Sequence, residues 1–285
     1  MKKYWSYIGD KLSNHITLAI QLLLLVLGIY VFIMAQRHVL WKVPLLFVGL
    51  LSWFLFRDKI KFPIVWIVPL MFLLIDLIFS YIWMANHHFM LVFMVLAVIF
   101  YTYHKSPDIL QKNIQILLVV VILASVVQKL MSSQFMSGEF YYYMINRGTL
   151  FTFFINLFPE SLEVTKSNYE LLKTLHNTDS NMGKSVVVKD VIPNLGKISI
   201  VYAWLTVIME FSVAILLLLK PKSAFTHILF SIMILGILCA RFETAFMALL
   251  AICGIILCKN QKLRLLFTMI VIGCVTLIVT KIGYH

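Results

Sequence analysis

Lys129 is a charged residue in an otherwise apolar stretch, and its neighbours carry hydroxyl groups. Ser125 precedes it by four residues and Ser132 follows it by three, a spacing that places all three side chains on one face of a helix. A charge within a membrane is costly and commonly marks a functional site. An amine at this place can accept or donate a proton. The alternative is a lysine that extends its charged group to the membrane surface.

Glu210 is the second charged residue of interest and lies near the middle of another apolar stretch. Tyr202 and Thr206 precede it at intervals of four residues, so the sequence predicts a stripe of polar groups along one helix face. A glutamate at that depth must be neutral, paired or in contact with water. The pattern agrees both with a hydrogen-bonded structural role and with an acid–base role.

Other residue types that carry chemistry form weaker patterns. Asp76 lies among leucines and isoleucines and is a candidate partner for Lys129 or Arg241. His87 and His88 are adjacent, but no third ligand follows at a spacing typical of zinc. The four cysteines match no metal pattern, and the glycine-rich and nucleophile motifs of soluble enzymes are missing. We therefore predict no metal site.

The composition is that of a membrane protein. The 285 residues are 62% hydrophobic and 13% charged, whereas a soluble domain has roughly 45–50% apolar and about 25% charged residues. The net charge of +12 comes from basic residues placed between apolar runs, so we expect the lipid bilayer, and no nucleic acid, as a partner. A span needs about 20 apolar residues. Nine stretches qualify as helical spans: 16–35, 40–56, 62–83, 88–103, 113–131, 198–219, 223–240, 242–258 and 264–283.

The predicted fold class is therefore all-α, a polytopic transmembrane helical bundle that forms a single membrane domain over residues 1–285. Basic residues gather in alternate connections, which predicts a cytoplasmic N-terminus and an external C-terminus. The first span shows no convincing cleavage site, and we expect a multi-pass protein of the plasma (inner) membrane. The basic clusters of the cytoplasmic side lie within 2–11, 57–61, 105–112, 220–222 and 259–264.

An extracytoplasmic insertion over residues 132–197 separates the fifth and sixth spans. Its first part, 135–158, is aromatic and is interrupted at Asn146-Arg147-Gly148, which predicts two short interfacial or re-entrant helices. Its second part is polar. There, Ser167-x-x-Glu170 is typical of a helix start and predicts a short surface helix that ends near His176.

Three segments resemble the HTTM family, the membrane module of vitamin K-dependent gamma-carboxylase and of bacterial relatives that include membrane proteins linked to peptide-toxin maturation. Their order is kept and they cover roughly residues 125–250. The segments are Gln128-Lys129-Leu130 with Phe135-Met136-Ser137-Gly138, then Trp204–Pro221 around Glu210, and finally Phe242–Met247.

The resemblance implies that Lys129 acts as a base, and that the cofactor is a quinone or another isoprenoid lipid. Two departures argue against vitamin K-type glutamate carboxylation. Ser231–Leu235 stands where the family's enzyme has a histidine, with His227 about two turns too early, and the large soluble C-terminal portion is missing.

We predict an HTTM-like membrane protein that modifies or matures a peptide or lipid-like substrate at the outer face. A small secreted peptide and a membrane or periplasmic protein are the partners to expect. The alternatives are a non-enzymatic quinone- or lipid-binding subunit and a toxin-immunity protein. Lys129 and Glu210 are the predicted catalytic residues, and the predicted substrate-binding residues are Phe135, Gly138, Tyr142, Tyr202 and Thr206.

Overall fold

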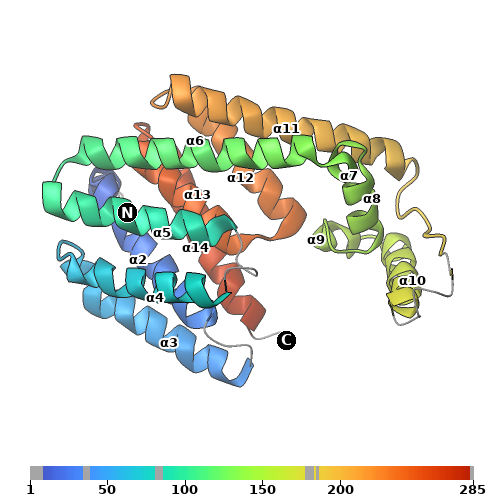
Figure 1. Cartoon of the computed structure of the whole chain (residues 1–285), viewed down its shortest axis with the longest axis horizontal. Helices are drawn as coiled ribbons and strands as arrows, with labels where there is room; N and C mark the ends of the chain where they lie inside the picture. The colour runs from blue at the N-terminus through green and yellow to red at the C-terminus, as the bar shows by residue number, and fades with distance from the viewer. Residues whose placement is uncertain (1–8, 35–38, 81–85, 177–182, 184–185, 283–285) are drawn as a thin grey trace. The chain divides into compact units, whose positions relative to one another are not determined.

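The computed structural model describes residues 9–34, 39–80, 86–176, 183 and 186–282, and the regular structure in these ranges is helical (Figure 1). The apolar helices are α2 (His15–Met34), α3 (Val39–Phe56), α4 (Ile64–Ser80), α5 (Asn86–His104), α6 (Pro107–Met131), α11 (Leu195–Leu219), α12 (Ala224–Arg241), α13 (Thr244–Leu257) and α14 (Gln261–Ile282). The insertion holds α7 (Ser133–Met136), α8 (Glu139–Asn146), α9 (Thr152–Ile155) and α10 (Pro159–His176), and a 3-10 turn, η1 (Arg57–Lys59), follows α3.

The all-α prediction is confirmed for the described residues, and each of the nine predicted apolar segments coincides with one helix. Among the described residues, five helices are long and apolar enough to cross a membrane, namely α5, α6, α11, α12 and α14. Three further apolar stretches are shorter: His15–Tyr30, Ile64–Phe79 and Thr244–Leu257. The chain therefore has the helices of a membrane protein, and the count of nine spans stays a prediction.

Helix α13 explains why apolar length and spanning length differ. It has 14 residues, which at 1.5 Å per residue is roughly 21 Å and less than the ~30 Å of a hydrocarbon core. Residues Met247–Leu257 are all buried. An apolar sequence of this kind is thus also suited to packing against protein on every side.

The helices group into two compact units. The first comprises residues 1–121, 213–234 and 243–285, and the second comprises 122–212 and 235–242. The predicted insertion, 132–197, lies wholly within the second unit, together with the end of α6 and most of α11.

In the first unit, α2 packs closely on α3. A Cβ added at Gly28 would lie 3.1 Å from the Gly49 carbonyl oxygen, so the two backbones meet where neither residue has a side chain.

A buried histidine joins three helices of the first unit. His88 is fully buried, with Nδ1 3.2 Å from the Tyr30 hydroxyl and Nε2 3.0 Å from the Leu73 carbonyl oxygen. A carbonyl only accepts, so His88 Nε2 is the donor.

In the second unit, the insertion forms four helices between α6 and α11 (Figure 1). The predicted interruption is confirmed, because α8 ends at Asn146 and Gly148 has a φ of +77°. The predicted start of the surface helix at Ser167 is wrong. Helix α10 ends at His176 as expected but begins at Pro159, where proline is favoured at a first helical position.

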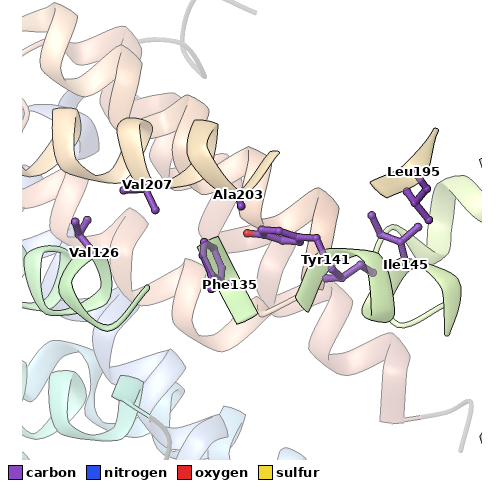
Figure 2. Close-up of a cluster of buried hydrophobic side chains, with 8 residues drawn as sticks. Val126, Phe135, Tyr141, Ile145, Leu195, Ala203 and Val207 are labelled. Carbon is purple, nitrogen blue, oxygen red and sulfur yellow. The ribbon is translucent and has the colours of Figure 1, made fainter. Parts of the chain in front are cut away.

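The core of the second unit is a cluster of apolar side chains from α6, α7, α8 and α11. Figure 2 shows Phe135 and Tyr141 beside Ala203 of α11, with Val207 of α11 near Val126 of α6 at one end of the cluster. Leu195, at the start of α11, packs at the other end near Ile145. Burial of these side chains holds the aromatic segment against α11.

Gly138 sits where the chain turns from α7 into α8. Its φ is +81°, and an added Cβ would lie 2.6 Å from the backbone nitrogen of Ile200. Both the backbone conformation and the space therefore require glycine.

Asn168 fixes the segment that returns from α10 to α11. Its side chain is fully buried and its Nδ2 donates to the carbonyl oxygens of Asn146 (3.1 Å) and Lys189 (2.8 Å). Its Oδ1 accepts from the Lys189 amide at 3.0 Å. Nearby, Asn146 Oδ1 accepts from the Val191 amide at 3.0 Å.

Gly138→Ala is expected to destabilise the second unit. A positive φ in a non-glycine residue costs roughly 1–3 kcal/mol, and the contact with Ile200 adds to this, so we expect a loss of at least about 2 kcal/mol. Thermal unfolding in detergent measures it. Gly196→Ala is the matched control, because nothing lies within 4 Å of an added Cβ there. Equal unfolding temperatures for the two variants would contradict the packing described.

Asn168→Ala is expected to release the segment around Lys189. Three backbone groups lose a buried partner, and each unsatisfied group costs about 1–3 kcal/mol. Limited trypsin digestion should then cleave after Lys189 faster than in the unmodified protein. Ser167→Ala, on the exposed neighbour, should leave the cleavage rate unchanged, and unchanged cleavage in both variants would refute the anchoring role.

Candidate functional site

Lys129 and Glu210, the two residues predicted to be catalytic, lie in contact in the second unit. Lys129 belongs to the last turn of α6, and Glu210 lies near the middle of α11. The Lys129 Nζ atom donates to Glu210 Oε1 at 2.6 Å and to Oε2 at 2.5 Å. Each oxygen of the carboxylate therefore contacts the amine.

Ser125 closes a triangle with this pair. The i, i+4 spacing places Ser125 one turn before Lys129 on the same face of α6, and Lys129 Nζ donates to its Oγ at 2.7 Å. The Ser125 hydroxyl in turn donates to Glu210 Oε2 at 3.2 Å. Amine, hydroxyl and carboxylate are thus in mutual hydrogen-bond contact.

The pair is largely removed from solvent. The Glu210 side chain is 7% exposed and that of Lys129 is 19% exposed. A buried charge without a partner is strongly unfavourable, whereas a pair with additional hydrogen bonds is tolerated. The Phe135 ring adds a further contact, with its centroid 5.8 Å from Lys129 Nζ, a distance suited to a cation–π interaction.

Two of the predicted substrate-binding residues lie one and two turns before Glu210 and contact Tyr141. The Tyr141 hydroxyl donates to Thr206 Oγ1 at 3.2 Å, and Thr206 donates to the Tyr202 carbonyl oxygen at 2.8 Å. The rings of Tyr141 and Tyr202 meet edge to face, with centroids 4.6 Å apart. Burial raises the pKa of Tyr141 to about 12, so its hydroxyl keeps its proton.

The other three predicted substrate-binding residues do not lie together. They are Phe135, Gly138 and Tyr142. Phe135 borders the Lys129 amine, as above. Gly138 serves the close approach to α11 and leaves no room there for a side chain. The Tyr142 hydroxyl donates to Asp190 Oδ1 at 2.6 Å, and this hydrogen bond raises the Tyr142 pKa. The structure therefore brings Tyr142 to Asp190 rather than to the Lys129–Glu210 pair.

Sequence reasoning missed Tyr141 and Phe151 as parts of this site. Tyr141 is buried and packs on Phe135 at a centroid distance of 5.1 Å, and the Phe151 ring lies 5.5 Å from that of Tyr202. The signal for Tyr141 was its i, i+4 spacing from Ile145, also buried. That spacing predicts an inward face of α8 with Tyr141 on it and Tyr142 off it.

Asp76 and His227 have partners away from the Lys129–Glu210 pair. Asp76 Oδ2 lies 4.0 Å from His88 Nδ1, whereas the partner of Lys129 is Glu210. His227 is buried with Nε2 2.8 Å from the Pro221 carbonyl oxygen. Across the described ranges, no three His, Cys, Asp or Glu residues form a metal-ligand group.

Comparison with known proteins adds no assignment. No protein-family model, no curated protein and no solved structure matches this chain.

Removing one charge of the Lys129–Glu210 pair should destabilise the protein far more than removing both charges. Lys129→Met leaves Glu210 buried and unpaired, which costs about 3–5 kcal/mol, while Lys129→Met combined with Glu210→Leu should lie within about 1 kcal/mol of the unmodified protein. Unfolding in mixed detergent micelles measures the stability of the two single variants, Lys129→Met and Glu210→Leu, and of the double variant. Additive losses from the two single changes would show that the side chains do not interact.

Proposed function

We propose that this chain is an integral membrane protein that modifies or matures a peptide or lipid-like substrate at the outer face of the plasma (inner) membrane. The proposal includes an HTTM-like bundle of about nine spans with a cytoplasmic N-terminus and an external C-terminus. Lys129 and Glu210 carry the proton transfers. The observation that supports it is the direct contact of these two residues, with Nζ 2.6 Å from Oε1, between two apolar helices.

The energetics favour a functional pair. Exchange of a buried ion pair for apolar residues of similar volume is often neutral or stabilising, so stability alone gives no reason for Lys129 and Glu210. Charged residues within membrane helices usually mark a functional site. An amine and a carboxylate 2.6 Å apart supply an acid and a base within hydrogen-bond reach of each other.

The neighbouring side chains suit an apolar or aromatic substrate group. Phe135, Tyr141 and Tyr202 form a connected set of rings next to the pair. Aromatic rings bind flat or apolar groups through large contact areas. This set also supports a second candidate function, a non-enzymatic subunit that binds a quinone or another isoprenoid lipid.

A comparison of cell products tests the enzymatic proposal. Native cells lacking the gene are supplied with the unmodified protein or with the Lys129→Met, Glu210→Leu double variant, and their lipids and secreted peptides are compared by mass spectrometry. We expect a product mass that depends on the unmodified protein and is lost with the double variant. The double variant removes both charges without leaving one buried and unpaired.

The matched control changes the same residue types on an exposed helix. Lys166→Met with Glu163→Leu on α10 alters two exposed residues and should leave the product unchanged. A product that persists with the Lys129→Met, Glu210→Leu variant would sink the enzymatic proposal. If that variant still co-purifies with a quinone or isoprenoid lipid, the binding function takes its place.

A further inference from the structure

Ser125 has the surroundings of an activated nucleophile. Its Oγ lies 2.7 Å from Lys129 Nζ, and the same amine is held at its other side by Glu210 Oε1 at 2.6 Å. A nucleophile within hydrogen-bond reach of a base, with the base oriented by a third group, is the arrangement that covalent catalysis requires. Serine–lysine pairs are a known variant of this arrangement.

We propose that Ser125 is the nucleophile of an acyl-transfer reaction, with Lys129 as its base and Glu210 as the group that orients Lys129. This inference rests on the proposed function and names its reaction class. The substrate class is a carbonyl compound, either the ester of a lipid or the amide of a peptide.

The proton inventory of the triangle allows this step. Lys129 first transfers one proton to Glu210 Oε1, which turns the ammonium into an amine and the carboxylate into a carboxylic acid. This transfer leaves both groups uncharged. The amine then has a free electron pair for the proton of Ser125.

The acyl transfer itself balances within the site. The Ser125 Oγ–H bond breaks as Oγ bonds to the substrate carbonyl carbon, and the proton moves to Lys129 Nζ. The bond from that carbon to the leaving group then breaks, and the leaving group departs with this proton as an alcohol or an amine. Water, deprotonated in turn by Lys129, hydrolyses the Ser125 ester and restores the hydroxyl.

Neighbouring serines lack these contacts. Ser132, predicted to share a helix face with Lys129, instead lies just beyond the end of α6 with extended backbone, and its Oγ accepts from the Phe135 amide at 3.3 Å to cap α7. Ser137 donates to the Gln134 carbonyl oxygen at 3.3 Å. Ser125 is thus the serine of this segment that the structure places in contact with both Lys129 and Glu210.

A fluorophosphonate probe tests the proposal without knowledge of the substrate. Such a probe forms a bond from phosphorus to an activated serine oxygen and releases fluoride. The full-length protein in detergent is treated with the probe and digested with trypsin. We expect the adduct on the peptide 113–129 at Ser125, its loss in Ser125→Ala, and unchanged labelling in Ser133→Ala, which alters an exposed serine of α7.

The rate of labelling separates an activated serine from an ordinary one. General-base assistance contributes typically 10²–10⁴-fold, so labelling of the Lys129→Met, Glu210→Leu variant, followed on its tryptic peptide 113–147, should be at least about 100-fold slower. Absence of the adduct at Ser125, or an equal rate in this variant, overturns the proposal. Turnover of p-nitrophenyl octanoate points to a lipid ester, and turnover of a peptide p-nitroanilide points to a peptide amide.

Failure of this inference can be told apart from failure of the proposed function. If Ser125→Ala keeps the cellular product that the Lys129→Met, Glu210→Leu variant loses, Ser125 is not the nucleophile and the proposed function stands. If both variants keep the product, both proposals fail. If both lose it and the adduct forms, both are supported.

Discussion

The register of α6 against α11 in the second unit depends on the contact of one amine with one carboxylate. Lys129 and Glu210 lie on different apolar helices, and each would be unfavourable there without the other. A shift of α6 along α11 by one residue would move Lys129 by about 1.5 Å and rotate it by about 100°, which breaks the contact. The ion pair therefore selects the register at which Val126 and Val207 join the same apolar cluster.

The aromatic segment after α6 is placed by a second set of constraints. Ser132 follows Lys129 by three residues and caps α7, and the Phe135 ring lies next to the Lys129 amine. Gly138 then turns the chain so that α8 meets α11 at Ile200. Tyr141 follows in the first turn of α8 and reaches Thr206, one turn from Glu210. Gly138 and the Lys129–Glu210 pair thus fix two different points of contact with α11.

Local patterns in the sequence were sufficient to predict the helices and to select Lys129 and Glu210 as candidate site residues. Apolar length predicted nine helical segments, and the i, i+4 spacing placed Ser125 beside Lys129. The contact of Lys129 with Glu210 crosses 81 residues, and no periodicity reports such a pairing. For the same reason, the prediction that Asp76 could pair with Lys129 had no means of choosing between partners. A carboxylate in an apolar stretch indicates that a partner is needed, and the sequence does not identify that partner. Tyr142 was preferred to Tyr141 although the spacing within α8 favoured the latter.

The third member of the triangle bears on what the pair does. A structural ion pair needs its remaining hydrogen-bonding groups satisfied, and the Ser125 hydroxyl meets part of that need. Lys129 keeps about a fifth of its side-chain surface exposed, whereas Glu210 is nearly covered. The Ser125 hydroxyl contacts both groups, Lys129 Nζ at 2.7 Å and Glu210 Oε2 at 3.2 Å. Under the proposed function, the buried carboxylate, the amine and the hydroxyl that contacts both supply the groups through which a proton would pass between substrate and protein.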